Sequence, residues 1–118
     1  MSDMPDYPPA LEPEDLDRYF LERANAGDVE GVVALYEPAA VLAFPVGHVT
    51  VGSEQIRGVY SDLFAGGPSF AGQIRPPVRH GDLAITSTIR PGNATVEVAR
   101  RQADGTWLWV IDQPSVLD

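Results

Sequence analysis

The chain has 118 residues, 44 % of them hydrophobic, and a formal net charge of −9 at pH 7 in which every cation is an arginine. This length and composition are typical of one globular domain with its own core, whereas the acidic balance argues against nucleic acid or an anionic membrane surface as a partner. Because there is no cysteine and only two histidines, thiolate and histidine-rich metal sites are not expected. We therefore expect neither a metal nor a cofactor.

The first eleven residues are acidic and rich in proline, and they resemble neither a signal peptide nor a membrane span. A segment of this kind is expected to be a flexible arm over residues 1–11. The remaining residues, 12–118, contain no linker and are expected to form a single domain. These features together favour a cytoplasmic location.

Three helices are predicted in the first part of the chain, over residues 13–26, 28–37 and 53–65. Gly27 followed by Asp28 combines a left-handed helix end with an N-cap for the second helix. The third helix has the clearest pattern, because its apolar residues recur at helical spacing: Ile56, Val59, Tyr60, Leu63 and Phe64.

The second part of the chain alternates between apolar and polar residues, as strands do. Residues 82–90, 94–103 and 106–113 are predicted as long strands. Prolines interrupt residues 70–78, so this segment is expected to be an edge strand or a bent strand. Helices followed by strands predict an α+β domain, with three helices covering one face of a curved, mostly antiparallel sheet.

Asp104-Gly105 is the strongest hairpin signal in the chain. A two-residue turn there places Glu97 opposite Asp112, with both carboxyls on one face of the sheet. The opposite face then carries Val96, Val98, Arg100, Trp107, Trp109 and Ile111. A four-residue loop keeps this register, whereas a three-residue bulged loop shifts it.

Two interpretations of Glu97 and Asp112 remain open at this point. Carboxylates that face each other repel, and partial burial would raise the pKa of at least one, giving a proton donor or acceptor near neutral pH. Alternatively, both acids lie in solvent and titrate normally, while the tryptophan face forms the core. The residues alone favour the second interpretation, because structural carboxylates outnumber catalytic ones.

The chain also contains a series of short motifs: Arg18-Tyr19-Phe20, Asn25-Ala26-Gly27-Asp28, Val33-Ala34-Leu35-Tyr36, Pro45-Val46-Gly47, Gly52, Ile56-Arg57 and Asp104-Gly105-Thr106-Trp107. Together they resemble the nuclear-transport-factor-2-like (NTF2-like) superfamily, in its ketosteroid-isomerase and SnoaL-like (polyketide cyclase) branch. The resemblance covers roughly Glu12 to Pro114. It implies a cone of curved sheet wrapped by three helices, an apolar pocket between them, and dimerisation through the outer sheet face.

The resemblance assigns positions to individual residues. It places the oxyanion-hole acid of the isomerases at Glu97 and an acid/base carboxylate of the cyclase branch at Asp112. The general base of the isomerases falls on Phe44, and their oxyanion tyrosine falls near Phe20, with Tyr19 one residue away. A steroid isomerase in the strict sense is therefore not expected.

The resemblance also implies which face of the hairpin points inward. It turns Glu97, Val110 and Asp112 toward the pocket and leaves Trp107 and Trp109 on an outer apolar patch, which a second copy of the chain is expected to cover. The residues predicted to bind the ligand are Tyr19, Phe20, Phe44, His48, Tyr60, Phe64 and Val110. They are expected to line one cavity of about 300–1,000 Å³.

The leading hypothesis is a cofactor-independent isomerase- or cyclase-type enzyme that does acid–base chemistry next to the carbonyl of a small apolar molecule. Asp112 would be the general base or acid, and a protonated Glu97 would donate a hydrogen bond to the developing oxyanion. The alternative is a non-catalytic, dimeric ligand-binding or accessory domain of the same fold, which the missing base at Phe44 supports. Burial and the pKa values of Glu97 and Asp112 discriminate between the two.

Overall fold

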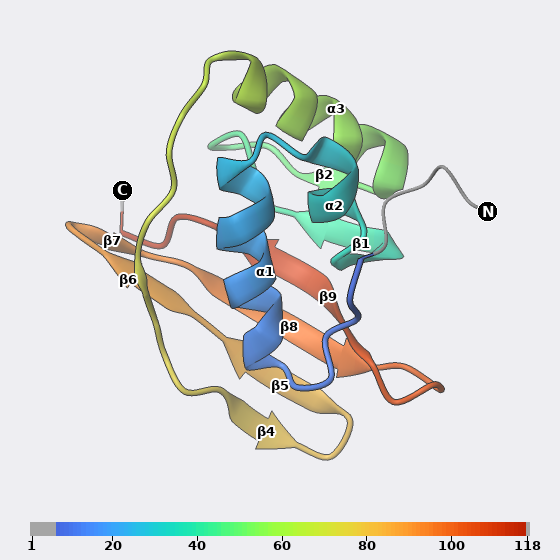
Figure 1. Cartoon of the computed structure of the whole chain (residues 1–118). Coiled ribbons are helices and arrows are strands. Elements are labelled where there is room, and N and C mark those ends of the chain that lie inside the picture. Colours follow the sequence, from blue (N-terminus) through green and yellow to red (C-terminus); the bar gives the residue numbers. More distant parts are fainter. Residues whose placement is uncertain (1–6, 118) are drawn as a thin grey trace.

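The computed structural model describes residues 7–117 and has the α+β architecture that the sequence predicts (Figure 1). Its helices are α1 (Glu14–Asn25), α2 (Val29–Val33) and α3 (Ser53–Ala65). Its strands are β1 (Tyr36–Leu42), β2 (Thr50–Val51), β3 (Gln73–Ile74), β4 (Val78–His80), β5 (Leu83–Thr86), β6 (Thr88–Arg90), β7 (Asn93–Ala94), β8 (Val96–Arg101) and β9 (Trp107–Gln113).

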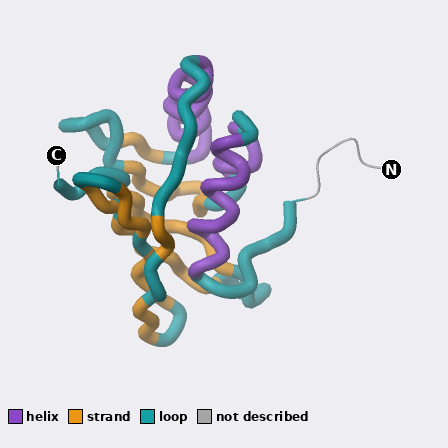
Figure 2. Tube along the Cα trace, turned by 60° about the vertical axis from the view of Figure 1, so that its left-hand side comes forward, coloured by secondary structure: helices purple, strands orange, loops and turns teal. Residues whose placement is uncertain are grey.

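The strands form two sheets. The larger has six strands in the order β2-β1-β9-β8-β5-β4, and the smaller has three in the order β3-β6-β7. Every pairing is antiparallel except that of β1 with β9, which is parallel. All three helices lie on the same side of the strands (Figure 2). The prediction of helices packed on a mostly antiparallel sheet is confirmed.

The turn between α1 and α2 forms as its sequence predicts. Gly27 has φ +68°, in the left-handed region that favours glycine. Asp28 is the N-cap of α2, because its Oδ1 accepts a hydrogen bond from the Gly31 N–H at 3.0 Å. This turn fixes the direction in which the chain enters the sheet.

The second helix is shorter than predicted. Instead of extending over residues 28–37 it ends at Val33, and β1 begins at Tyr36. The prediction assumed that Pro38 marks the end of a helix, but this proline lies inside β1. Proline is tolerated there because the pairing of β1 with β9 shifts register between Tyr36 and Val41, so the missing N–H falls in an irregular part of the ladder.

The long strands predicted over residues 82–90 and 94–103 each break once, at Ser87 and Thr95. On one side of the breaks β5 and β8 belong to the larger sheet, and on the other side β6 and β7 belong to the smaller one. The hairpin that they form therefore passes from one sheet to the other. Residues 70–78 do the same, with β3 in the smaller sheet and β4, which extends beyond that segment, in the larger, so the bent strand expected there is two short strands.

The loop of the β8–β9 hairpin is the three-residue bulged type rather than a two-residue turn. The Gln102 N–H donates to the Thr106 carbonyl at 2.7 Å, and Gly105 takes the left-handed position with φ +87°. As a result Arg101 lies opposite Trp107, one residue away from the register of a two-residue turn.

A second irregularity restores the predicted register further along the hairpin. Trp109 and Ile111 both have partners on β8, and Val110 between them has none, which defines a β-bulge. The alternation of side chains skips one residue at this point. Glu97 therefore does face Asp112, as predicted.

The outward orientation predicted for the two tryptophans is wrong. Trp107 and Trp109 are only 3 % and 2 % exposed, because the bulged loop turns them inward before the β-bulge brings Asp112 to the same face. The Trp109 ring packs against Tyr36 and Phe20, with ring centroids 5.3 Å and 6.0 Å apart. The tryptophans and the carboxyls thus share the inner face of the sheet.

The outer face of the larger sheet carries aliphatic side chains instead. One residue from each strand belongs to a continuous series of cross-strand partners, which we call the aliphatic row: Val51, Val41, Ile111, Val98, Ile85 and Val78. Cross-strand partners project from the same face of a sheet. The row therefore forms one ridge, in which Ile85 and Ile111 are 48 % and 47 % exposed.

Residues 7–11, part of the segment expected to be a flexible arm, lie against the domain. The Tyr7 hydroxyl donates to Asp28 Oδ1 at 2.8 Å, and Ala10 is buried. Residues 1–6, the rest of that predicted arm, lie outside the described residues. Within residues 7–117, every helix is too short or too polar to cross a membrane.

Candidate active site

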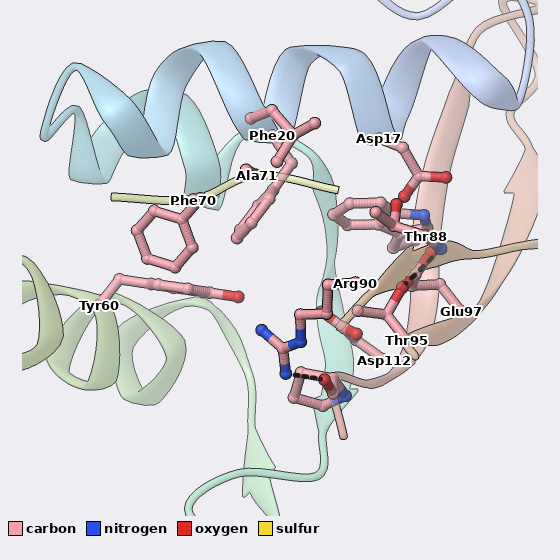
Figure 3. Close-up of a pocket in the computed structure, with 13 residues that line it drawn as sticks. Asp17, Phe20, Tyr60, Phe70, Ala71, Thr88, Arg90, Thr95, Glu97 and Asp112 are labelled. Atoms are coloured by element: carbon pink, nitrogen blue, oxygen red, sulfur yellow. Dashed lines mark hydrogen bonds between the residues drawn. The ribbon is translucent and has the colours of Figure 1, made fainter. Parts of the chain in front are cut away.

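Three acidic side chains meet in the interior between α1 and the larger sheet. Glu97 on β8 and Asp112 on β9 are cross-strand partners and are 3 % and 4 % exposed. Asp17 on α1 approaches them from the helical layer and is equally buried. Figure 3 shows all three on the same side of a pocket. Burial of a carboxyl is costly unless the group is protonated or hydrogen-bonded, so the partners of these acids determine their chemistry.

Two tyrosines hold Asp112. The Tyr36 hydroxyl donates to Asp112 Oδ2 at 2.5 Å, and the Tyr36 and Tyr60 hydroxyls lie 2.7 Å apart. Because the Tyr36 proton is directed at Asp112, Tyr60 is the donor to Tyr36. Burial, followed by the nearby Asp112, raises the pKa of both tyrosines well above the ordinary value, so both remain protonated donors.

The pKa of Asp112 is raised to about 8. Burial is the largest cause, repulsion by Glu97 adds to it, and the hydrogen bond from Tyr36 acts in the opposite direction. Near neutral pH this side chain is therefore mainly a neutral carboxylic acid. One of its oxygens accepts from Tyr36, which leaves the other to carry the proton.

A second chain of hydrogen bonds holds Glu97. Thr86 Oγ1 donates to Glu97 Oε1 at 2.6 Å, and Trp109 Nε1 donates to Thr86 Oγ1 at 3.1 Å. The Glu97 and Asp17 carboxyls also share a hydrogen bond. Since an ionised carboxylate can only accept, this pair needs one proton between its two members.

That proton belongs to Glu97. Burial and then repulsion by Asp17 raise the pKa of Glu97 to about 9. Burial also raises the pKa of Asp17, but only to about 6, because the hydrogen bond that it accepts from Glu97 acts against the rise. Near neutral pH the site thus holds one carboxylate, on Asp17, and two carboxylic acids. It can accept a proton at one point and donate a proton at another.

Asp17 was not singled out from the sequence. It is one of several acidic residues in the first turn of α1, where acids commonly complement the helix dipole. A usable signal was present, because Asp17 lies three and four residues before Phe20 and Leu21 and so shares their face of the helix. All three residues line the pocket. Asp17 is buried, and apart from the proton of Glu97 no donor within the described chain reaches its Oδ2.

The pocket consists of two adjoining cavities. The three carboxyls line one of about 60 Å³, and the other, of about 200 Å³, has no acidic residue in its described lining. Six residues line both: Phe20, Tyr60, Phe70, Arg90, Thr95 and Pro114. Leu42, Phe44 and Leu63 add to the apolar wall of the larger cavity. The sequence predicts a single cavity of about 300–1,000 Å³. The pocket is smaller than this and is divided into two cavities.

Some of the aromatic residues predicted to bind the ligand line these cavities. Phe20 and Tyr60 line both, and Phe44 lines the larger. Phe64 is not part of the lining. It packs against Tyr60 and Phe70, at centroid distances of 5.4 Å and 5.8 Å, and so supports two residues that do line the pocket.

The other predicted ligand-binding residues lie elsewhere. The Tyr19 ring packs between the guanidinium groups of Arg18 and Arg23, 4.6 Å and 4.7 Å from its centroid. His48 is exposed and lines a third hollow at the turn before β2, which shares Phe44 and Ser115 with the larger cavity. Val110 occupies the β-bulge and lines neither cavity. The aromatic residue of α1 that faces the pocket is thus Phe20 rather than Tyr19.

A family model described as the SnoaL-like domain matches residues 16–114. The chain belongs to the SnoaL-like family. The matched range contains all three carboxyls and every lining residue of the two cavities except Ser115, and the predicted superfamily is confirmed. No curated protein matches this chain in sequence.

Several solved structures resemble this SnoaL-like domain over most of its length. A candidate calcium/calmodulin-dependent protein kinase type II association domain from Thiobacillus denitrificans is 22 % identical with a TM-score of 0.74, covering 98 % of this chain and 100 % of that one. A ketosteroid isomerase-like protein from Erwinia carotovora is 23 % identical with a TM-score of 0.72, covering 84 % and 88 %. A candidate dehydratase of the NTF2-like family from Streptomyces avermitilis is 17 % identical with a TM-score of 0.69, covering 87 % and 93 %. At these identities, the likeness shows the fold alone.

Proposed function

We propose that this SnoaL-like domain is a cofactor-independent enzyme that moves a proton next to the carbonyl of a small, mostly apolar molecule. The observation that carries the proposal is the placement of three buried carboxyls, one ionised and two protonated near neutral pH, on the wall of an otherwise apolar pocket. Isomerisation, cyclisation and dehydration all need this combination of a base and an acid.

Each carboxyl has a distinct role in the proposed reaction. Asp17, the ionised group, accepts a proton from the carbon beside the carbonyl. Asp112, held by Tyr36, donates its proton to the carbonyl oxygen or to a leaving hydroxyl. Glu97 donates its hydrogen bond to Asp17 in the free protein. Once Asp17 is protonated, the proton of Glu97 becomes available to stabilise the developing oxyanion.

The names of two structural relatives agree with this class of reaction. One is described as ketosteroid isomerase-like and another as a candidate dehydratase of the NTF2-like family. The isomerases have their general base at the position that is Phe44 in this chain, so that base is absent. Asp17 supplies a carboxylate from α1 instead. The proposed chemistry therefore uses the same fold with the base on a different element.

The alternative is a non-catalytic binding or accessory domain. The phenylalanine at position 44 supports it, and so does the relative described as a candidate association domain. This alternative gives the buried carboxyls no role that requires a raised pKa. It predicts that ligands bind the pocket without chemical change.

We also propose that the protein is a homodimer whose copies meet through the aliphatic row. The tryptophans, which first suggested this interface, are buried and cannot take part. The support now comes from the six cross-strand partners of the row, since an aliphatic ridge this long is seldom left in water. Both functional alternatives are compatible with such a dimer.

Deuterium exchange tests the proposed chemistry without knowledge of the natural substrate. Small ring ketones such as cyclohexanone and 2-methylcyclohexanone are incubated with the protein in D₂O, and loss of the signal from the protons beside the carbonyl is followed by NMR. We expect catalysed exchange with the wild type, a large loss with Asp112→Asn, and no change with Asp62→Asn, an exposed aspartate on α3. Binding of the ketones without exchange would support the non-catalytic alternative.

A further inference from the structure

Arg90 brings a positive charge into this pocket. It is the last residue of β6, it is half-buried, and it lines both cavities. Its Nη2 donates to the Pro114 carbonyl at 3.0 Å. Figure 3 shows the guanidinium on the side of the pocket where Tyr60 lies, separate from the carboxyl of Glu97.

The hydrogen-bond partners of Arg90 differ from those of most arginines in the protein. Five others pair with carboxylates at the surface: Arg18 with Asp15, Arg57 with Glu30, Arg79 with Glu12, Arg100 with Glu37 and Arg101 with Asp82. Within residues 7–117, no carboxylate oxygen lies within the 4.0 Å limit of an ion pair with Arg90. In the described part of the chain, its one hydrogen-bond partner is the Pro114 backbone carbonyl, which carries no charge.

A guanidinium partly removed from water is best satisfied by an anion. It presents five N–H donors in a planar fork that matches a carboxylate, and the bond to Pro114 occupies a small part of that fork. The lining of the larger cavity, which includes Phe70 and Leu63, contains no acidic residue that would compete for the guanidinium. Charge-assisted bonds to such a group are stronger than neutral ones.

The size of the larger cavity limits the rest of the ligand. A cavity of about 150 Å³ in a protein interior accommodates benzene, so the 200 Å³ found here fits about one ring. The wall around that space is aromatic and aliphatic. The acidic residues line only the smaller cavity, so an anion beside Arg90 can be held apart from them.

We propose that Arg90 binds the carboxylate of a single-ring carboxylic acid, whose ring occupies the larger cavity and whose reacting carbon points toward Asp17 and Asp112 in the smaller one. This narrows the proposed substrates to ring compounds that carry both a carbonyl and a carboxylate. The inference rests on the proposed function for the reacting end of the molecule. Binding of the carboxylate end is argued from Arg90 and the larger cavity alone, and its affinity can be measured without turnover.

The test compares phenylacetate with its neutral analogue phenylacetamide, using isothermal titration calorimetry. For the wild type we expect phenylacetate to bind at least about tenfold more tightly, as one charge-assisted pair allows. Arg90→Gln should remove this preference by weakening phenylacetate alone, and Arg90→Lys should retain part of it. Arg75→Gln is the matched control, because Arg75 is exposed and lines neither cavity.

The outcomes separate this inference from the proposed function. Equal affinity of the wild type for the two probes, no binding of phenylacetate, or an unchanged preference in Arg90→Gln would overturn it. If Arg90→Gln does not fold, as judged by circular dichroism, the partial preference expected of Arg90→Lys decides instead. Asp112→Asn should still bind phenylacetate even though it loses deuterium exchange, so a failure of the chemistry and a failure of anion binding give different results.

Discussion

On the inner face of β8 and β9, Glu97 and Asp112 are buried, whereas on the outer face of the same strands Val96 and Ile111 are exposed. An antiparallel sheet with one solvated face normally shows the reverse, with apolar residues toward the core and polar ones toward water. The arrangement costs stability twice, through the desolvation of acids and through the exposure of aliphatic surface to water.

The difference between the faces indicates two separate binding tasks. The inner face keeps acids buried, where their pKa values are raised toward the range useful for proton transfer. The outer face keeps a ridge that only another apolar surface can cover. We therefore expect substitutions on the inner face to change chemistry without changing assembly, and substitutions on the outer face to change assembly without changing chemistry.

The largest expected effect is in the pocket between the inner face and α1. Asp17→Asn replaces the one ionised carboxyl of the site with an amide that cannot accept a proton, so we expect the rate of deuterium exchange to fall by about 10²–10⁴-fold. The melting temperature should stay the same or rise, because the substitution removes a buried charge while the amide oxygen can still accept the hydrogen bond from Glu97. An exchange rate equal to that of the wild type would show that Asp17 is not the base.

On the outer face, Ile85→Glu places a charge within the aliphatic row, between Val98 and Val78. We expect the dissociation constant of the dimer to increase by at least about 30-fold, the effect of losing one strong interface contact, as measured by analytical ultracentrifugation. Ile89→Glu is the matched control, because Ile89 is similarly exposed but lies on β6 in the smaller sheet. A wild-type protein that is monomeric at micromolar concentration would contradict the proposed dimer.

The pH dependence of stability should come from the inner face. The pKa of Asp112 is about 8 in the folded protein, against an ordinary value of 3.8 for an aspartate in an unfolded chain, so between these values the folded state retains a proton that the unfolded state has lost. Stability must then fall as pH rises through this window. We expect Asp112→Asn to gain about 1–3 kcal/mol relative to the wild type between about pH 5.5 and about pH 9, as measured by urea unfolding. Parallel pH profiles of the two proteins would contradict this.

The smallest effect concerns the tyrosines. Tyr36→Phe removes the hydrogen bond that lowers the pKa of Asp112, so that pKa should rise further, by about one unit if the bond contributes a typical ~1 kcal/mol. The alkaline limb of the pH profile for deuterium exchange should move to higher pH by the same amount. A limb that stays in place or moves to lower pH would show that Asp112 is not the group whose proton limits the reaction.

The fold could be predicted largely from local signals, because they agree with the tertiary structure. Gly27 and Asp28 provide a helix end and a cap, and the change from helical to alternating spacing marks the start of the sheet. The exception is Pro38, which looks like a helix stop but lies in an irregular strand. A single residue cannot show whether the chain around it is paired.

The site was predictable only in part. The pairing of Glu97 with Asp112 was predicted, although two compensating irregularities produce it, the bulged loop and the unpaired Val110. No glycine or proline marks that bulge, and inward packing of Trp109 favours it, so the orientation of the tryptophans could not be derived. Asp17 was missed because an acid in the first turn of a helix is commonly explained by the helix dipole. Its place in the site depends on the approach of α1 to the sheet, which the sequence does not show.

Side-chain carboxyl NMR measures directly which of the three buried carboxyls are protonated near neutral pH. With ¹³C-labelled protein, the carboxyl resonances of Asp17, Glu97 and Asp112 are followed across the pH range, with Asp17→Asn, Glu97→Gln and Asp112→Asn to assign them. We predict pKa values of about 6 for Asp17, about 9 for Glu97 and about 8 for Asp112. Asp17 is then the one of the three that is ionised near neutral pH. If all three titrate near the ordinary value of about 4, the pocket holds no carboxylic acid at neutral pH, and the proposed acid–base chemistry is contradicted.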